Sequence, residues 1–396
     1  MLSTLGDSTR PGTRQRQVEK LERRWREATG QNHVVVCRSA TAAARLAIHS
    51  LGIGPGDEII CPADASPPSL VFTAANGAVP VPVDIDPVTL QIDPAAVAAA
   101  VTPRTRAVLV ADRYGTTPDY SALEAIGWRH GLVLLEDASQ ARGATFRGRP
   151  AGSMGTVNYC ALPSLGSSAT LGRGGIVATS DVRATSVVRR ALLVDRIPIA
   201  DDNLMDLVEA GDWTVPMSEL DAAAAELALV RLEEAVAIRA ANGSRLAGRL
   251  ADVPGLALPA PIEGATNVYS SFPIVVLPDE LGLTERSAPV LRDAIIDSLF
   301  AEGLRLDRWS PQPLGVDPVE HRLLPPGSSS EHRGPDYPAA AALVEGALVL
   351  GTAPCPLDAV DPTVVDDVAD AFLKVVVEHA DRLRHLVNER CRPVIG

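Results

Sequence analysis

The chain has 396 residues, 46% of them hydrophobic, and a formal net charge of −13 at pH 7. This length supports a large buried core, and we expect one large domain with a smaller second one. The acidic balance excludes nonspecific nucleic-acid binding, and no apolar stretch reaches the roughly 18 residues of a membrane span. The polar N-terminus, residues 1–17, lacks the apolar core of a secretion signal, so a cytoplasmic protein is expected.

Cysteine and histidine usage argues against a metal site. The chain has five cysteines, which are scattered and lack CxxC spacing: Cys37, Cys61, Cys160, Cys355 and Cys391. This pattern predicts reduced thiols and no zinc ligation. The histidines form no HxH or HExxH pair, and no dinucleotide-binding loop stands out, which disfavours a metal hydrolase and an NAD enzyme.

Helical and strand-like segments alternate over the first 180 residues. We expect helices over 14–28, 42–51, 69–76, 95–100 and 120–130, and strands over 33–36, 57–61, 79–83, 106–111, 132–135, 157–162 and 176–179. Strands that alternate with helices of about ten residues predict an α/β fold, in which crossover helices connect a mostly parallel sheet.

The pattern changes after residue 179. A helix over 182–194 and one long helix over 219–250 precede a second, α+β unit, with strand-like 267–276 and 304–309, helices over 288–302 and from 339 and 362, and a strand over 348–351. The Pro-, Gly- and Ser-rich segment 311–338 is long enough for a lid. We therefore expect an N-terminal lead-in and helix (1–30), a large α/β domain (31–250) and a small C-terminal domain (251–396).

The segment 131–179 holds the strongest signal for a site. A buried strand ends in Glu136 and Asp137, and the first motif runs DASQARG over 137–143. A second motif, ALPSLGSSATLGRGG, covers 161–175. Carboxylates at the carboxyl end of a strand lie where open α/β sheets bind their ligands, so a ligand crevice is predicted beside Asp137.

Both motifs resemble those of the DegT/StrS family of pyridoxal-phosphate (PLP) sugar aminotransferases. There, Asp-Ala-Ala/Ser-Gln-Ala-His-Gly precedes Ser-Phe-x-x-x-Lys-x-Leu-Gly-x-x-Gly-x-Gly-Gly. Further similar strings are LGIGPGDE (51–58), GAVPVPVDID (77–86) and MSE (217–219). The resemblance implies a PLP-dependent transferase-like (fold type I) large domain with a mostly parallel seven-stranded sheet, a small α+β C-terminal domain, and a homodimer with crevices at the subunit boundary.

Several positions keep the residue that the family uses. The resemblance implies that Asp137 pairs with the pyridinium nitrogen of the cofactor and that Gln140 lies beside the oxygen edge of its ring. It also places Ser39, Ala40 and Thr41 at the cofactor phosphate, at the N-terminus of a helix, where the helix dipole favours anions.

Other positions depart from the family. Gly166 stands at the Schiff-base lysine, and the only lysines in the chain are Lys20 and Lys374. Ala161 replaces a phosphate-contacting serine, and Ser66 stands where an aromatic ring usually stacks on the cofactor. In the Asn-x-Arg-Met-Ser motif, by which the neighbouring subunit reaches the phosphate, Thr214 and Pro216 replace Asn and Arg. Because the lysine is missing, we expect a chain that forms no covalent link to PLP. Each lost hydrogen bond to a charged phosphate is worth about 1.5–3 kcal/mol, so we also expect weaker binding of the cofactor.

The remaining candidates surround this pocket. We expect Asp137 to act as the acid or base, with Arg113 and Tyr114 as anion or oxyanion contacts. Further pocket candidates are Arg38, Asp64, Ser66, Ser139, Ser164, Ser167 and Trp213. Each has a structural alternative, because carboxylates cap helices, arginines form surface ion pairs, serines occupy flexible loops and tryptophans pack.

These observations predict an enzyme of bacterial natural-product metabolism that uses the vacated PLP pocket without a cofactor. Its small-molecule substrate would be an anionic compound or a biosynthetic intermediate, and the reaction a cyclisation, dehydration, isomerisation or condensation. Two alternatives stay open. One is a sugar aminotransferase or dehydratase-like enzyme that binds PLP or pyridoxamine phosphate (PMP) non-covalently. The other is a non-catalytic partner subunit of a true aminotransferase.

Overall fold

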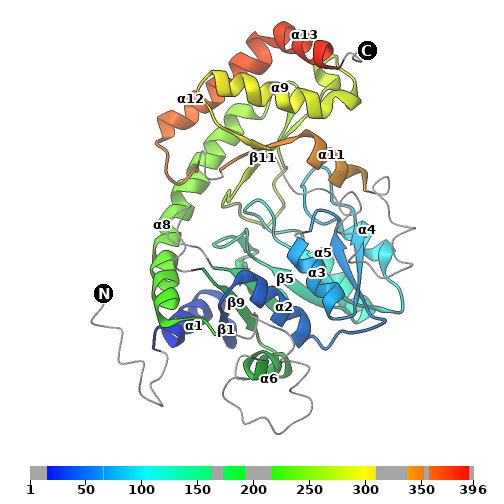
Figure 1. The fold of residues 1–396 in the computed structure, drawn as a ribbon, viewed down its shortest axis with the longest axis vertical. Helices are drawn as coiled ribbons and strands as arrows, with labels where there is room; N and C mark the ends of the chain where they lie inside the picture. Colours follow the sequence, from blue (N-terminus) through cyan, green and yellow to red (C-terminus); the bar gives the residue numbers. More distant parts are fainter. Residues whose placement is uncertain are drawn as a thin grey trace.

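The computed structural model describes residues 16–65, 67–162, 173–191, 216–308, 337–351 and 356–391. Two sheets organise these residues (Figure 1). The strands of the larger sheet are β1 His33–Cys37, β2 Glu58–Pro62, β3 Val79–Val83, β4 Thr105–Ala111, β5 Val133–Asp137, β8 Val157–Ala161 and β9 Gly175–Thr179. The helices around it are α1 Arg16–Thr29, α2 Ala40–Ser50, α3 Pro67–Ala75, α4 Pro94–Ala100, α5 Tyr120–His130, α6 Val182–Ala191 and α8 Glu219–Leu250.

The larger sheet has seven strands in the order β1-β9-β8-β5-β4-β2-β3. Neighbouring strands from β8 to β3 run parallel, while β9 runs antiparallel to both β1 and β8. The expected α/β class with a mostly parallel sheet is confirmed. Because the parallel strands share one direction, their carboxyl ends meet at a single edge of the sheet.

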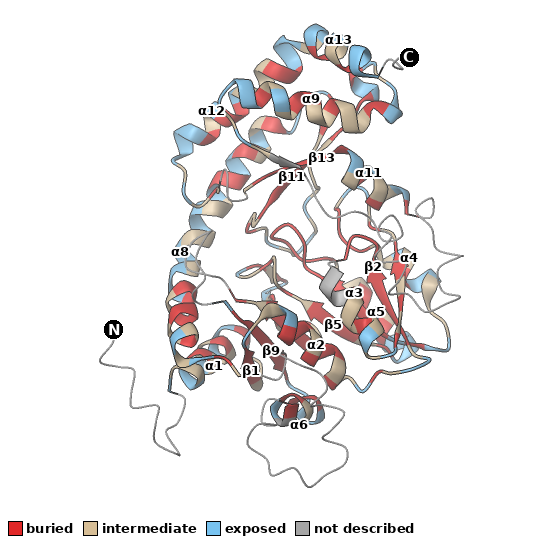
Figure 2. Ribbon diagram, in the orientation of Figure 1, coloured by how far each residue is buried: buried red, intermediate tan, exposed pale blue. Residues whose placement is uncertain are grey.

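Helices cover both faces of this sheet. Alternate residues of β4 point in opposite directions: Ala107 and Leu109 pack with α2, α3 and α6, whereas Val108 and Val110 pack with α1, α4, α5 and α8. Burial on both faces explains why the strands read as continuous apolar runs in the sequence. The strands are accordingly buried along most of their length (Figure 2).

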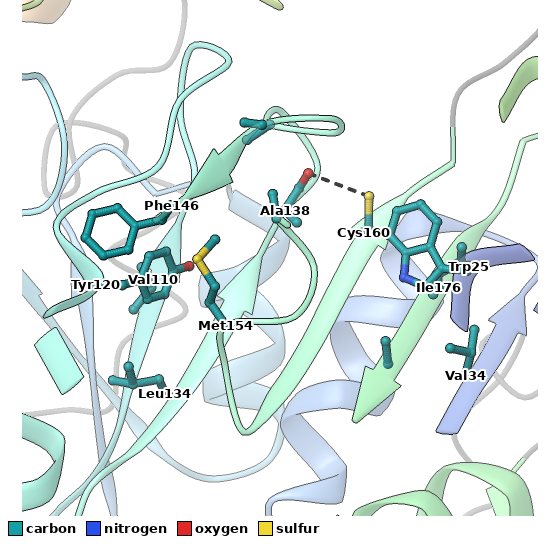
Figure 3. Close-up of a cluster of buried hydrophobic side chains, with 14 of the residues drawn as sticks. Trp25, Val34, Val110, Tyr120, Leu134, Ala138, Phe146, Met154, Cys160 and Ile176 are labelled. Carbon is teal, nitrogen blue, oxygen red and sulfur yellow. Dashed lines mark hydrogen bonds between the residues drawn. The ribbon is translucent and has the colours of Figure 1, made fainter. Parts of the chain in front are cut away.

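The core on the α1, α5 and α8 side is rich in aromatic and sulfur-containing side chains (Figure 3). Tyr120 and Phe146 lie with ring centroids 6.1 Å apart in a tilted arrangement, which is favourable for aromatic pairs. Cys160 points into this core, where its thiol donates a weak hydrogen bond to the Ala138 carbonyl at 3.6 Å.

Helix α8 has 32 residues and runs from the larger sheet to the second one (Figure 1). Ser218 caps it, accepting a hydrogen bond from the Asp221 amide at 3.1 Å and donating to the Asp221 carboxylate at 2.6 Å. The first of these hydrogen bonds satisfies an amide that a helix start leaves unpaired. The helix spans the residues expected from its Ala- and Leu-rich pattern.

The second sheet lies near the far end of α8. Its strands are β10 Leu256–Ala257, β11 Phe272–Val276, β12 Asp307–Arg308 and β13 Ala347–Leu350. The α-helices of this unit are α9 Ala288–Ala301, α11 Pro338–Gly346, α12 Pro362–Leu373 and α13 Ala380–Arg390. A π-helical turn, Lys374–Glu378 (η8), and two 3₁₀ turns, Asp279–Leu281 (η5) and Glu285–Ser287 (η6), complete it. Two residue pairs, Thr145–Phe146 (β6) and Arg149–Pro150 (β7), form a small separate ribbon. The domain limits expected from the sequence stay a prediction.

One expected strand is shorter than predicted. The sequence pattern indicated strand over 267–276, but β11 begins only at Phe272. The Asn267 side chain accepts a hydrogen bond from the Tyr269 amide at 2.7 Å, and Tyr269 has φ of 45°. An Asx turn of this kind competes with strand pairing and keeps these residues in a loop.

Candidate functional site

Three strand ends meet where the sequence predicted a ligand crevice. Asp137 is the last residue of β5, and the pairing register places it beside Ala111 of β4 and Tyr159 of β8. The N-terminus of α2 follows the end of β1 at the same edge, because Arg38 and Ser39 directly connect the two elements. Side chains from four strand connections can therefore converge on one small volume.

A cavity of about 210 Å³ occupies this edge. Its lining residues are Ala40, Thr41, Ala44, Ala111, Asp112, Arg113, Asp137, Ser139, Gln140, Tyr159 and Ala161. Six of the residues predicted from the sequence are among them: Ala40, Thr41, Arg113, Asp137, Ser139 and Gln140. The structure thus gathers candidates that lie up to 100 positions apart in the chain.

Asp137 is half-buried and held on both oxygens. Its Oδ1 accepts a hydrogen bond from the Ser139 amide at 3.0 Å, and its Oδ2 accepts one from the Tyr159 hydroxyl at 3.0 Å. A carboxylate oxygen has two lone pairs, so each can accept another donor from the cavity side. Asp137 is therefore oriented by the protein while keeping the capacity to bind a cationic N–H group.

The neighbouring Glu136 has a different task. It points to the opposite face of the sheet, is fully buried, and accepts hydrogen bonds from the amides of Gly152, Met154 and Gly155 at 2.5, 2.7 and 3.2 Å. Burial raises its pKa, against the effect of these amides. Glu136 therefore fixes the loop after β7, and of these two adjacent residues Asp137 is the one that lines the cavity.

Asp112 adds a second buried carboxyl group beside Glu136. Burial raises its pKa well above the ordinary range, and the charge of Glu136 adds to the effect. The Tyr120 hydroxyl donates to Asp112 Oδ1 at 2.9 Å, and the Asp112 carboxyl group also pairs with Glu136. Asp112 is thus expected to stay protonated, which avoids a second buried negative charge near Asp137.

The N-terminus of α2 forms the opposite wall of the cavity. The Ser39 hydroxyl caps the helix by accepting from the Ala42 amide at 3.0 Å. First-turn amides such as those of Ala40 and Thr41 have no carbonyl partner within a helix, so they favour an anion. A Cβ on Gly175 would lie 2.5 Å from the Ser39 carbonyl oxygen, so the glycine lets β9 approach this helix start.

Gln140 and Ser139 secure the loop after β5. Gln140 Oε1 accepts a hydrogen bond from the Tyr114 amide at 3.2 Å, and Ser139 Oγ accepts one from the Ala161 amide at 3.0 Å. Tyr114 has φ of 59°, a conformation uncommon for a residue with a side chain. These contacts fix the two side chains against the ends of β4 and β8.

Arg113, Tyr114 and Asp64 form a buried polar cluster at one end of the cavity. Arg113 Nη2 lies 3.3 Å from Asp64 Oδ2, and the Tyr114 hydroxyl donates to the same oxygen at 3.0 Å. Burial is the largest single influence on Arg113 and lowers its pKa, but Asp64, Tyr114 and Asp137 together outweigh burial and raise it. Burial, with the charge of Asp64, also raises the pKa of Tyr114. Arg113 is therefore a permanent cation, and Tyr114 is a hydrogen-bond donor rather than a base.

The other predicted residues are placed differently. Arg38 is exposed and does not line the cavity beside Asp137. Ser39, Asp64 and Tyr114 are also absent from the lining of that cavity. The following candidates lie outside the described residues: Ser66, Ser164, Gly166, Ser167 and Trp213. Cys160 faces the core on the other side of the sheet (Figure 3), where burial raises its thiol pKa to about 12.

A larger cavity of about 670 Å³ lies beside the smaller one. Tyr114 and Thr116 contribute to its wall, so the segment that follows β4 separates the two spaces. Its described lining contains no charged side chain. The smaller cavity, with Asp137, Arg113 and a helix N-terminus, has the groups that acid–base or anion-binding chemistry requires, and it is the candidate site.

Sequence reasoning missed Tyr159 and Asp112. Tyr159 lies within the apolar segment predicted as a strand and was not singled out, although it is directly opposite Asp137 in the β5–β8 register. Asp112 follows β4 directly and precedes the candidates Arg113 and Tyr114. A pairing of β5 with β8, had it been known, would have predicted the contact of Tyr159 with Asp137.

No group of three or more His, Cys, Asp or Glu side chains suited to a metal ion occurs in the part of the chain that the structure describes. Nor does any described helix combine the length and apolar character needed to cross a membrane.

The larger sheet and the helices around it have the fold type I architecture of PLP-dependent transferases. Residues 7–354 match the DegT/DnrJ/EryC1/StrS aminotransferase family, and the chain belongs to this family. The family membership inferred from the two motifs is thus confirmed.

Individual relatives agree with this assignment. The chain is 38% identical over 276 residues to the L-glutamine:2-deoxy-scyllo-inosose aminotransferase of Streptoalloteichus tenebrarius, a match that covers 67% of this chain and 64% of the length of that relative. It resembles S. venezuelae DesV, solved in complex with a ketimine intermediate, with 29% identity, a TM-score of 0.72 and coverage of 92% and 91% of the two chains. A Streptococcus pneumoniae protein described as a sugar aminotransferase, in its PMP form, shares the fold with 21% identity, a TM-score of 0.77 and coverage of 98% and 95%.

These findings correct one prediction. We expected a pocket without a cofactor, and this expectation is wrong, because the chain belongs to an aminotransferase family whose relatives are PLP-dependent. The residues present suit such a cofactor: a carboxylate for the ring nitrogen, an amide side chain near the ring, and free helix amides for the phosphate, all on one cavity. Lost side chains reduce the expected affinity, while these described groups are the ones that would hold the cofactor.

Proposed function

We propose that this chain binds PLP or PMP without a covalent link in the cavity beside Asp137, and that it acts on a sugar or cyclitol as an aminotransferase or dehydratase-like enzyme. The observation that carries the proposal is the Asp137 carboxylate, which two donors orient while it faces a cavity shared with the N-terminus of α2. When bound, the cofactor supplies an electron-accepting ring.

Each wall of the cavity has a role in this proposal. Asp137 would accept the N–H of the protonated ring nitrogen, and the amides of Ala40 and Thr41 would bind the phosphate at the start of α2. Gln140 would donate its amide N–H to the ring oxygen, because its Oε1 already accepts from the Tyr114 amide. Arg113 would place a fixed positive charge at the end of the cavity that holds the cofactor.

The lysines of the chain support a non-covalent complex. Lys20 on α1 lies 3.1 Å from Glu226 on α8, and Lys374 lies 2.6 Å from Glu302. Neither belongs to the described lining of the cavity. Gly166 stands at the family's lysine position, so a base for proton transfer would have to come from another side chain or from the substrate amine.

The substrate class follows from the relatives. The 38% identical relative is named for L-glutamine and 2-deoxy-scyllo-inosose, a cyclic polyol ketone, and the family comprises aminotransferases. A neutral ring with several hydroxyl groups is therefore the substrate we propose, within bacterial natural-product metabolism. We also propose a homodimer, as the family resemblance implies.

A binding titration tests the proposal. Absorbance and calorimetric titrations with PLP and with PMP should give saturable binding to the wild-type protein. Asp137→Asn should weaken it about 10- to 150-fold, because the variant loses a charge-assisted hydrogen bond worth about 1.5–3 kcal/mol. Asp119→Asn is the matched control, because Asp119 caps α5 away from the cavity, and asparagine also caps helices. Absence of saturable binding, or equal binding by wild type and Asp137→Asn, would refute the proposal.

A further inference from the structure

Tyr159 is the only described side chain that donates a hydroxyl hydrogen bond to Asp137. It is 3% exposed, lines the cavity, and lies opposite Asp137 in the β5–β8 register. Its ring packs in the core with α2 and α3, so the hydroxyl has a fixed position. The chain therefore builds a buried O–H group onto the carboxylate that would meet the cofactor.

We propose that Tyr159 is a positioning residue: its hydroxyl orients Asp137 toward the cavity and weakens the hold of that carboxylate on the proton of the cofactor's ring nitrogen. This inference rests on the proposed function. The inference goes beyond the proposed function, because Tyr159 lies outside both sequence motifs. It gives this residue control over how strongly the cofactor ring attracts electrons.

The direction follows from the competition for lone pairs. A hydrogen bond to a carboxylate stabilises its charged form and lowers its proton affinity. The Ser139 amide and the Tyr159 hydroxyl each occupy a lone pair of the Asp137 carboxylate, so less of its acceptor capacity is left for a ring N–H. Loss of the hydroxyl should make Asp137 a stronger acceptor and keep the ring nitrogen protonated to higher pH.

Other charged groups near Asp137 do not reverse this direction. From β4 it faces Arg113, a cation, and Asp112, which burial keeps protonated. On its own strand Glu136 is held by amides on the opposite face, and Arg142 from the following loop donates to the carbonyls of Ser139 and Ala161. The lining residues from α2 are Ala40, Thr41 and Ala44, which carry no charge. None of these groups changes its charge when the Tyr159 hydroxyl is removed.

Tyr120 offers a matched control. Its buried hydroxyl donates to a carboxyl group at 2.9 Å, as that of Tyr159 does at 3.0 Å, but the acceptor is Asp112. Tyr120 belongs to the core on the other face of the sheet and does not line the cavity. Tyr120→Phe and Tyr159→Phe therefore remove the same chemical group, and only the second touches Asp137.

The test is a pH titration of bound PMP labelled with ¹⁵N in the ring, followed by ¹⁵N NMR in the wild type and both variants. We expect the midpoint for loss of the ring proton to rise by about one pH unit in Tyr159→Phe, a roughly tenfold gain in proton affinity, and to stay unchanged in Tyr120→Phe. The dissociation constant for PMP, measured in parallel, reports whether the pocket still binds.

The outcomes separate this inference from the proposed function. If PMP binds both proteins and the midpoint for loss of the ring proton is the same in Tyr159→Phe as in the wild type, or lower, the role of Tyr159 is overturned. The proposed function then still stands. A wild-type protein that does not bind PMP overturns both. An equal rise in Tyr120→Phe also overturns the inference, because the effect would then not act through Asp137.

Discussion

The pairing of Arg113 with Asp64 makes a strong quantitative prediction. Their side chains are 6% and 1% exposed, and Arg113 Nη2 lies 3.3 Å from Asp64 Oδ2. Asp64→Asn keeps the size of the side chain and an acceptor for the Tyr114 hydroxyl, but removes the charge opposite the guanidinium. Breaking a buried ion pair from one side costs about 3–5 kcal/mol, so we expect the free energy of unfolding to fall by that amount.

A double-mutant cycle isolates the pair. Arg113→Met should destabilise the protein similarly, because it leaves Asp64 buried without its cation. The double variant Asp64→Asn with Arg113→Met buries no charge at either position, and we expect it to be less destabilised than the sum of the single variants by about 2–4 kcal/mol. Urea unfolding followed by far-UV circular dichroism supplies the four free energies.

An exposed pair serves as the control for this cycle. Arg149 and Glu124 lie 2.6 Å apart with side chains 44% and 40% exposed. Water screens such a pair, so its coupling energy should be at most about 1 kcal/mol. A coupling energy for Arg113 and Asp64 no larger than that of this exposed pair would contradict the buried arrangement at the end of the cavity.

Three further predictions concern the surroundings of the cavity. Burial raises the Asp112 pKa above its unfolded value, so the stability that this group supports is complete at acidic pH and is lost as pH rises through the folded pKa. In urea unfolding, the Asp112→Asn variant should therefore lose less stability than the wild type between pH 5 and pH 8. Equal losses of stability in the two proteins would be evidence against this prediction. Gly175→Ala should destabilise by about 1–3 kcal/mol and weaken PMP binding, because the new Cβ would lie 2.5 Å from the Ser39 carbonyl, whereas unchanged stability would mean that β9 can shift. N-ethylmaleimide at pH 8 should label the exposed Cys391 and leave Cys160 unmodified, as read from peptide mass spectra, because burial raises the pKa of the Cys160 thiol to about 12. Rapid labelling of Cys160 would show that its strand opens.

The sequence predicted the sheet and the helices around it well. Apolar runs such as 106–111 and 132–135 correspond to β4 and β5, because strands buried on both faces need hydrophobic residues throughout. The long helix over 219–250 was predicted to the residue, since its composition is rich in helix formers and Ser218 supplies a cap. These are local signals, which a single sequence contains.

The contacts within the site depended on information that a single sequence lacks. Asp137 was predictable from its position at a strand end, but its partner Tyr159 was not, because the pairing of β5 with β8 is a long-range relation. Likewise Asp64 and Arg113 were predicted as separate candidates, and the pairing of β2 with β4 joins them into one ion pair. The absence of a cofactor was inferred from lost residues, and the comparison with PLP-dependent relatives corrected it.

The central claim is that the cofactor is held beside Asp137 without a lysine, and borohydride trapping tests it most directly. The protein is saturated with PLP, treated with borohydride, denatured and analysed by intact-protein and peptide mass spectrometry, while a native spectrum records the complex before reduction. We expect one cofactor per chain in the native spectrum and no pyridoxyl adduct after denaturation. A stoichiometric pyridoxyl group on Lys20 or Lys374 would contradict it.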